Sequence, residues 1–162
     1  MGNDMNDLTI RPYRPDDESG VIRLWFECDL VVPWNNPKRD IERKLGVDPE
    51  WFLVGESGGM IIATCMAGYE GHRGWINYLA VSPRHRRRGI ATSLMKEAER
   101  LLEEAGCPKI NLQVREGNEE AIRFYESIGF TMDPILSMGR KLVEDEPYSA
   151  GEDAASGGEV PG

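Results

Sequence analysis

One stretch, residues 75–105, constrains the fold more than any other, because an apolar run, a basic turn and a long amphipathic segment follow one another in it. Residues 75–81 are apolar on both faces, which is typical of a central strand. Pro83 begins the turn, and Gly106 and Pro108 end the segment after it. That segment, residues 89–105, predicts a helix with one apolar face, formed by Ile90, Leu94, Met95, Ala98, Leu101, Leu102 and Ala105.

The turn between strand and helix is basic, with the sequence Arg84-His85-Arg86-Arg87-Arg88-Gly89-Ile90-Ala91-Thr92. A helix start presents unpaired backbone N–H groups and the positive end of the peptide dipole. Guanidinium groups add charge-assisted hydrogen bonds. We therefore expect the turn to hold the pyrophosphate of a nucleotide-type cofactor. The alternative is that the arginines form a solvated cap on an acidic helix, but such a cap has no need of the Gly89-x-Ala91 spacing.

The net charge of −9 is unevenly distributed along the 162 residues. Six of the 28 acids follow Lys141, where no base stands, so the rest of the chain carries 22 acids against 19 bases. This near balance argues against a nucleic-acid partner, which requires a broad basic face. We expect a single domain over residues 1–142 and a disordered tail over residues 143–162, because the tail is acidic and rich in Gly, Ala and Ser.

Neither a membrane segment nor a metal site is expected. No apolar run approaches the length of a membrane span, and the start Met1-Gly2-Asn3-Asp4 does not lead into a hydrophobic stretch. The three cysteines, Cys28, Cys65 and Cys107, have no paired spacing and are interpreted as reduced core residues rather than disulfides or zinc ligands. We therefore expect a cytoplasmic protein.

The remaining elements predict a mixed sheet with helices on both faces. Helices are expected from Asp16 to Cys28, from Asn36 to Gly46 and from Asn118 to Gly129, each beginning at a polar capping residue. Strands are expected, in chain order, at residues 8–12, 51–54, 60–67, 75–81, 109–114, 130–132 and 135–142.

Two sequence blocks lie on the expected elements in a characteristic order. Arg86-Arg87-Arg88-Gly89-Ile90-Ala91 is similar to the acetyl-CoA signature [QR]-x-x-G-x-[GA], and Asn118-x-x-Ala121-x-x-x-Tyr125-x-x-x-Gly129-Phe130 is similar to a second block of the same family. The chain therefore resembles the GNAT-superfamily N-acetyltransferases over residues 8–142. Within them, residues 33–37 and 40–44 resemble the bacterial YpeA-type acetyltransferases.

The resemblance implies the GNAT fold, an α/β (α+β) architecture with a mixed, mostly antiparallel sheet of six to seven strands that splays at its centre. It also implies acetyl-CoA as cosubstrate, with its pantetheine arm between the parallel strands at residues 75–81 and 109–114. The residues expected to bind it are Leu79, Ala80, Val81, Arg86, Arg87, Arg88, Gly89, Ile90, Ala91, Thr92, Asn118 and Tyr125.

Two residues are candidates for proton transfer. Tyr125 matches the tyrosine of the family, and a phenol with a pKa near 10 can protonate a thiolate whose conjugate acid has a pKa near 8.5; the alternative is a ring that only packs on the sheet. Gln113 stands where N-terminal acetyltransferases of this superfamily carry a glutamate, and an amide cannot accept the proton. Glu70 is then the candidate base, acting through water, with His72 a weaker choice; the alternative for Glu70 is a solvated loop acid.

The expected activity is transfer of an acetyl group from acetyl-CoA to a primary amine by direct attack on the thioester. The alternative is a non-catalytic acyl-CoA sensor or partner-binding module, which Gln113 favours. Edge strands near the C-terminus would also allow a homodimer. The residues expected to line the acceptor site are Trp34, Asn35, Glu70 and Gln113, although a packing lid is an equal alternative for Trp34.

Overall fold

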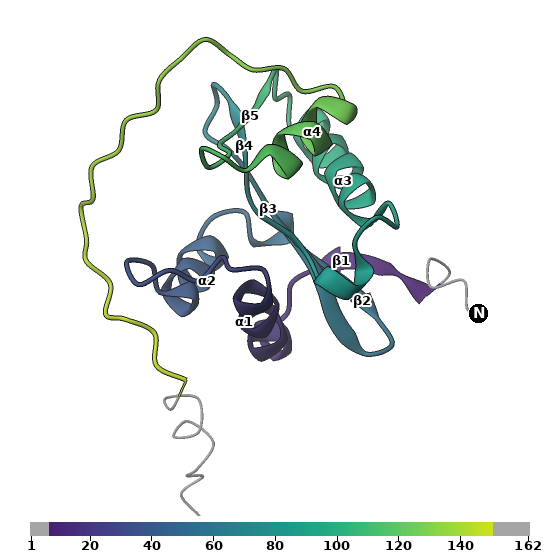
Figure 1. The fold of residues 1–162 in the computed structure, drawn as a ribbon, viewed down its shortest axis with the longest axis vertical. Coiled ribbons are helices and arrows are strands. Elements are labelled where there is room, and N and C mark those ends of the chain that lie inside the picture. Colours follow the sequence, from purple (N-terminus) through teal and green to yellow (C-terminus); the bar gives the residue numbers. More distant parts are fainter. Residues whose placement is uncertain (1–6, 151–162) are drawn as a thin grey trace, which may run out of the picture.

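A five-stranded sheet in the order β1-β2-β3-β4-β5 forms the centre of the computed structural model, which describes residues 7–150 (Figure 1). The first four strands pair antiparallel, and β5 pairs parallel with β4. This confirms the mixed, mostly antiparallel sheet and the GNAT fold. The strands are β1 Thr9–Pro12, β2 Phe52–Ser57, β3 Met60–Tyr69, β4 Gly74–Val81 and β5 Ile110–Leu112.

Two of the helices begin at the polar capping residues that the sequence predicts. The Oδ1 atom of Asn36 accepts a hydrogen bond from the Lys38 amide at 3.0 Å, and that of Asn118 accepts one from the Ala121 amide at 3.2 Å. The first helix was expected to start at Asp16. It instead follows a short 3-10 turn, and Asp17 precedes it with its carboxylate held by Arg11 at 2.7 and 2.9 Å. The four helices of the described chain are α1 Glu18–Glu27, α2 Pro37–Leu45, α3 Ile90–Glu104 and α4 Glu119–Ser127.

Helices cover both faces of the sheet, so the protein has two apolar cores (Figure 1). Neighbouring residues of β2 point to opposite cores because side chains alternate along a strand: Phe52 packs with α1 and α2, and Leu53 packs with α3. Trp25 of α1 and Leu94 of α3 are both fully buried at the centres of these cores. Burial of these apolar stripes is what holds the helices in place.

The sheet was expected to splay at its centre, but β4 and β5 separate at one edge of the described sheet, because the strands predicted after β5 are not formed. The parallel pairing of β4 and β5 covers only three residues of each strand and ends at Ile76 and Leu112. Beyond Ile76, β4 pairs with β3 alone within the described residues. Trp75 was expected to be inside the sheet but is 36% exposed. It pairs with Asn111 of β5, and because side chains alternate along a strand it points to the face opposite that of its buried neighbours Gly74 and Ile76.

The two strands predicted at residues 130–132 and 135–142 are absent from the described chain, and the expected count of six to seven strands is therefore wrong. Figure 1 shows this segment as an extended run that leaves α4 and arcs toward α1 and α2. Pro134 interrupts it and cannot donate a ladder hydrogen bond. Side chains hold the segment instead: Lys109 contacts Asp133 at 2.6 Å, and Gln113 contacts Ser137 at 2.5 Å.

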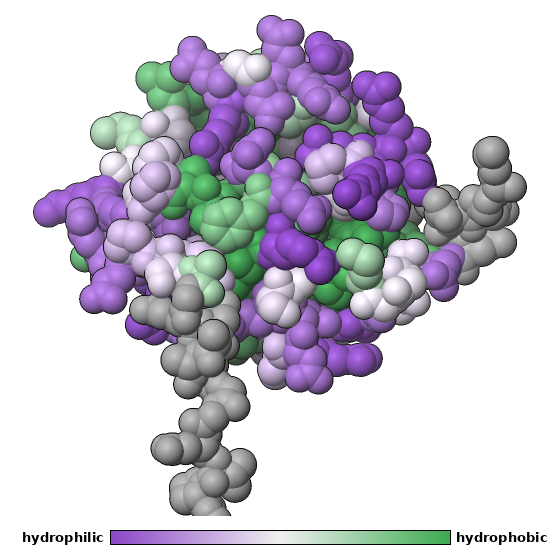
Figure 2. Space-filling view, turned by 60° about the horizontal axis from the view of Figure 1, so that its bottom comes forward, coloured by the Kyte–Doolittle hydropathy of each residue, from purple (hydrophilic) through white to green (hydrophobic). Residues whose placement is uncertain are grey.

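The segment exposes several apolar side chains, from 63% to 96% of their area: Met132, Ile135, Leu136, Met138, Leu142 and Val143. The face seen in Figure 2 is mostly hydrophilic, with apolar residues gathered toward its middle. No helix in residues 7–150 combines the length and apolar character needed to cross a bilayer.

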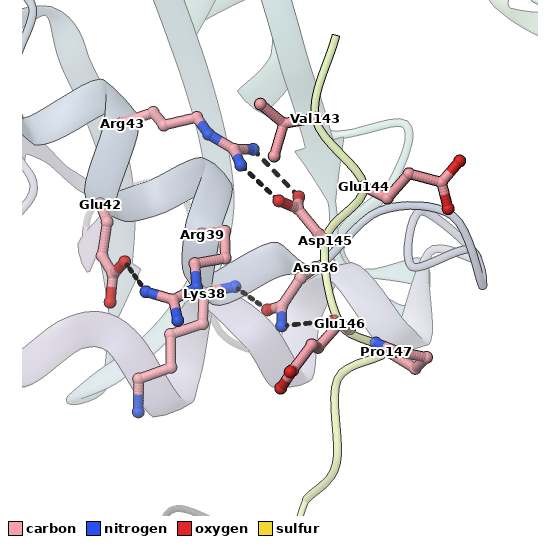
Figure 3. Close-up of a pocket in the computed structure, with 10 residues that line it drawn as sticks. All are labelled: Asn36, Lys38, Arg39, Glu42, Arg43, Val143, Glu144, Asp145, Glu146 and Pro147. Atoms are coloured by element: carbon pink, nitrogen blue, oxygen red, sulfur yellow. Dashed lines mark hydrogen bonds and ion pairs between the residues drawn. The ribbon is translucent and has the colours of Figure 1, made fainter. Parts of the chain in front are cut away.

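The first part of the predicted tail lies against α1 and α2 (Figure 3). Asp145 forms an ion pair with Arg43, and the Glu146 carbonyl accepts a hydrogen bond from the Asn36 amide group at 2.9 Å. The Tyr148 ring lies 5.8 Å from that of Phe26. Residues 151–162, for which disorder is also predicted, lie outside the described residues.

Candidate active site

The basic turn before α3 has the backbone geometry of an anion site. Arg87 and Gly89 both have positive φ, 64° and 77°. Gly89 takes the N-cap position of α3, but no side chain caps the helix. The amides of Ile90, Ala91 and Thr92 therefore lack the side-chain acceptor that Asn36 supplies to α2 and Asn118 to α4. An anionic group fits this uncapped, arginine-flanked helix start.

His85 adds a feature that the sequence did not single out. Its Nδ1 atom is buried and has no hydrogen-bond partner among the described residues, while its backbone amide donates to the Ser82 carbonyl at 2.8 Å. A buried ring nitrogen without a partner is rare and costly in proteins. The basic turn therefore contains, close to the predicted pyrophosphate site, a buried ring nitrogen that could form a further hydrogen bond.

The carbonyl of Val81, the last residue of β4, binds two side chains, one just after α1 and one in the basic turn. The Val81 carbonyl accepts hydrogen bonds from the Cys28 thiol at 3.4 Å and from the Arg86 Nε atom at 3.2 Å. Burial raises the pKa of the Cys28 thiol, and the contact with Arg86 partly opposes this. Arg86 thus folds back onto the strand, whereas Leu79 stays half-buried on the part of β4 that β5 does not cover.

Tyr125 lies on α4, with its ring 5.2 Å from Phe124 and 5.6 Å from Phe130. Burial raises the pKa of its phenol to about 12, so the hydroxyl keeps its proton at neutral pH. The hydroxyl makes no hydrogen bond within residues 7–150, which leaves it available to a ligand. Asn118, at the start of the same helix, uses its side-chain oxygen as the cap.

Glu70 lies at the opposite end of β4 from the basic turn. Its carboxylate accepts hydrogen bonds from the amides of His72 and Arg73, at 2.9 and 2.6 Å, and from the Trp75 indole at 3.1 Å. These contacts, the Arg73 amide first, lower the pKa of Glu70. The eight residues of β4 extend over roughly 20 Å. Glu70 therefore stabilises the turn into β4, and the length of the strand separates it from the basic turn.

Two of the remaining acceptor-side candidates, Trp34 and Gln113, contact the C-terminal segment. The Trp34 carbonyl accepts a hydrogen bond from Lys141 at 2.5 Å, while 57% of the residue is exposed. Asn35 follows it and is half-buried. Gln113 donates to the Ser137 hydroxyl. Below this loop, α2 and residues 143–147 enclose a cleft of about 560 Å³ (Figure 3).

A second constellation, missed by the sequence patterns, lies where β4 leaves β5. Tyr78 and Leu79 of β4 stand opposite the single residue Cys65 of β3, which is a β-bulge. The Tyr78 hydroxyl donates to the Asp40 carboxylate of α2 at 2.6 Å. Burial, reinforced by this hydrogen bond, raises the pKa of Tyr78. No sequence signal pairs two residues that are 38 positions apart.

Within residues 7–150, no group of three or more His, Cys, Asp or Glu side chains is arranged to hold a metal ion. Two polar features flank the part of β4 that β5 leaves uncovered. The arginine turn lies at the start of α3, and the Asp40–Tyr78 pair lies on the side of α1 and α2.

Comparison with known proteins places the chain among acetyltransferases. The model of the acetyltransferase (GNAT) family matches residues 19–130. An acetyltransferase of Sodalis glossinidius is 49% identical over 142 residues, which are 87% of this chain and 100% of that protein. An acetyltransferase of Pectobacterium atrosepticum is 48% identical over 141 residues, with the same coverage of 87% and 100%.

Solved structures share the fold. Ard1 from Thermoplasma volcanium matches with a TM-score of 0.69 at 28% identity, over 78% of this chain and 84% of that one. AAC(6′)-Iy, solved with the bisubstrate analogue CoA-S-monomethyl-acetylneamine, matches with a TM-score of 0.68 at 18% identity, over 84% and 99%. With the family model spanning most of the folded part and two bacterial relatives matched along their whole lengths, the chain belongs to the acetyltransferase (GNAT) family.

Proposed function

We propose that this protein is an acetyl-CoA-dependent N-acetyltransferase that moves an acetyl group to a primary amine by direct attack on the thioester. The observation that carries the proposal is the uncapped start of α3, flanked by arginines and placed where β4 and β5 separate. Coenzyme A is an elongated anion with a pyrophosphate at one end and a thioester at the other, which matches an anion site beside an open strand edge.

The donor is held mainly by backbone groups of the turn. The amides from Arg87 to Ala91 donate to the pyrophosphate, and Thr92 continues the first turn of α3. Arg86 and Arg88 supply the surrounding positive charge. The pantetheine arm lies along Leu79, Ala80 and Val81, with Asn118 at its far side. Bound acetyl-CoA supplies an activated acetyl carbon, and a strand amide of β4 polarises its carbonyl.

Tyr125 is the proposed general acid. The amine nitrogen forms a bond to the acetyl carbon, the carbon–sulfur bond breaks, and Tyr125 donates its proton to the departing sulfur. The acceptor arrives as an ammonium ion and loses one proton to solvent before its nitrogen attacks; the nitrogen loses a second proton as the amide forms, and that proton restores Tyr125. A phenol whose pKa is about 12 stays protonated until the sulfur departs. The carboxylate of Glu70 already accepts hydrogen bonds from the amides of His72 and Arg73, so water takes the first proton in this scheme.

An amine acceptor is supported by relatives of the same fold. One solved neighbour is an aminoglycoside 6′-N-acetyltransferase from Acinetobacter haemolyticus, with a TM-score of 0.67 at 19% identity. Another is AAC(6′)-Iy with its bisubstrate analogue CoA-S-monomethyl-acetylneamine. We place the acceptor mouth near Trp34, Asn35 and Gln113, which the C-terminal segment holds on one side.

The test is release of free thiol from acetyl-CoA in the presence of four amines: a tetrapeptide with a free N-terminus, Nα-acetyl-lysine, spermidine and tyramine. The expected result is thiol release that depends on at least one amine, with the acetylated amine identified by mass spectrometry. The N-acetylated tetrapeptide, in which the amine is blocked, should give none.

The second candidate is a non-catalytic acyl-CoA sensor, which the contact between Gln113 and Ser137 favours because the amide is engaged structurally. In that case calorimetry would detect acetyl-CoA binding, and thiol release would be absent with every amine. This outcome would remove the enzyme proposal.

A further inference from the structure

We propose that Asp40 and Tyr78 form the subsite that binds and orients the acceptor amine, a proposal that rests on the function proposed above. The two residues come from α2 and β4 and meet at 2.6 Å on the face of the sheet opposite α3. Neither belongs to the sequence blocks of the donor site. Their chemistry, a carboxylate beside a phenol, suits a cationic primary amine.

The position of Tyr78 is the first support. It lies in the bulge at which β4 has already left β5, one residue before Leu79, which the proposed donor site includes. A bulge re-aims side chains at the edge of a sheet and is typical of functional sites. Tyr78 therefore reaches the α1–α2 side of the gap at the level where the acetyl group would lie.

Tyr78 is also held rigidly in an unfavourable backbone conformation. Its φ is 50°, which costs a non-glycine residue energy. The ring is stacked on Trp25 with centroids 3.9 Å apart. Thr64 accepts a hydrogen bond from the Trp25 indole at 2.9 Å and donates one to the Tyr78 carbonyl at 2.8 Å. Several contacts thus hold Tyr78 in its strained conformation, as is expected where a side chain must be placed accurately for binding.

The charges around Asp40 leave its carboxylate able to take a further donor. Arg43 of the same helix contacts Oδ1 at 3.2 Å, but its guanidinium also pairs with Asp145 (Figure 3). Tyr78 donates to Oδ2. The Asn35 side chain also hydrogen-bonds to Tyr78, and the charge of Arg115 lies near the pair. The Asp40 side chain is 24% exposed, so a ligand reaches it without displacing the core.

The chemistry follows from this geometry. An acceptor amine arrives as an ammonium ion and can donate to Oδ1 of Asp40 and to the hydroxyl oxygen of Tyr78. Hydrogen bonds to a charged partner are the stronger kind. An acceptor that carries a hydroxyl in place of the amine gains no ion pair here, so the pair would select for amines.

The experiment compares Asp40→Asn and Tyr78→Phe with Glu42→Gln in the full chain. Glu42 is a matched control because it also lies on α2 and pairs with an arginine three residues away, Arg39 at 2.8 Å. Steady-state kinetics would use whichever of the four amines supports thiol release. Thermal unfolding of each variant would verify that it is folded.

The expected result is a KM for the amine about ten- to a hundredfold higher in Asp40→Asn, with an unchanged KM for acetyl-CoA. Tyr78→Phe, which keeps the ring, should give a smaller rise, and Glu42→Gln none. Equal amine KM values in Asp40→Asn and wild type would overturn the subsite and leave the enzyme proposal standing.

Calorimetric titration of the same four amines into the CoA-loaded protein separates the two proposals. If no amine is acetylated but one binds to wild type and at least tenfold more weakly to Asp40→Asn, the enzyme proposal fails and the subsite stands. If neither turnover nor amine binding occurs in wild type, the subsite is overturned as well.

Discussion

Positive φ angles at single residues shape both halves of the candidate active site. Gly89 has φ of 77° in the basic turn, and Tyr78 has φ of 50° at the bulge of β4. Glycine adopts this region without penalty, whereas a tyrosine does so only when its surroundings hold it there. The donor turn therefore has a glycine suited to its backbone beside a strained arginine, Arg87 with φ of 64°, and Tyr78 is the strained residue on the acceptor side.

Gly89→Asp is expected to abolish acetyl-CoA binding, because it places a side chain and a negative charge against the pyrophosphate. Gly106→Asp is the matched control: its φ is 83°, a Cβ there meets nothing within 4 Å, and it lies at the other end of α3. Aspartate tolerates positive φ better than most residues, so both variants should fold. Calorimetry should detect normal binding only in Gly106→Asp, and binding in both would move the site elsewhere.

Tyr125→Phe is expected to lower kcat about a hundredfold while acetyl-CoA affinity stays the same, because only the hydroxyl is removed. Tyr69→Phe serves as control, since within residues 7–150 the Tyr69 hydroxyl hydrogen-bonds to the Gly71 and Gly106 carbonyls alone, at 3.2 and 3.4 Å. Thiol-release kinetics and acetyl-CoA titration provide the two readouts. Unchanged kcat in Tyr125→Phe would end its assignment as the acid.

At the scale of elements, the junction of α3, β4 and β5 sets where the central strands separate. Gly74 begins β4, and its amide donates to the Lys109 carbonyl at 2.8 Å just before β5. A Cβ at Gly74 would lie 2.7 Å from the Cys107 sulfur and 3.3 Å from Leu102 of α3. The absence of a side chain thus allows the helix and both strands to meet.

Gly74→Ala is therefore expected to destabilise the protein by about 1–3 kcal/mol, the usual cost of overpacking. Gly68→Ala is the matched control in β3, because a Cβ there meets nothing within 4 Å. Urea unfolding of both variants measures the difference. Equal stabilities would mean that the junction has room that the geometry does not indicate.

At the scale of the whole molecule, buried tyrosines link stability to alkaline pH. Burial raises the pKa of Tyr13 and of Tyr125 to about 12 each, whereas an unfolded tyrosine ionises near 10. The folded state therefore retains protons that the unfolded state has lost above pH 10. The stabilising contribution is complete below that pH and declines as pH rises from about 10 to about 12.

Urea unfolding at pH 8, 10 and 11 should accordingly show a constant free energy of unfolding up to pH 10, as far as these tyrosines contribute, and a fall at pH 11. Tyr13→Phe should reduce that fall, because it removes one titrating group and keeps the ring stacked on Phe52 at 4.6 Å. An identical pH dependence in wild type and Tyr13→Phe would exclude Tyr13 as a source.

Local patterns correctly predicted the order of the helices and strands as far as α4, the capping residues Asn36 and Asn118, and the position of the basic turn. Helix periodicity, caps and a charged turn depend on residues within a few positions of one another, so the sequence by itself determines them. The same patterns predicted strands at residues 130–142, where apolar residues occur but Pro134 interrupts pairing.

Only the tertiary structure decided which side chains meet. Asp40 reaches Tyr78 because α2 packs over a bulge in β4, and the bulge depends on the pairing of β3 with β4. The fold also shows that the carboxylate of Glu70, the candidate base, accepts hydrogen bonds from the backbone amides of its own turn. The sequence by itself determined the donor turn, because that site is one continuous segment. The acceptor side required the fold, because it is assembled from contacts between distant segments.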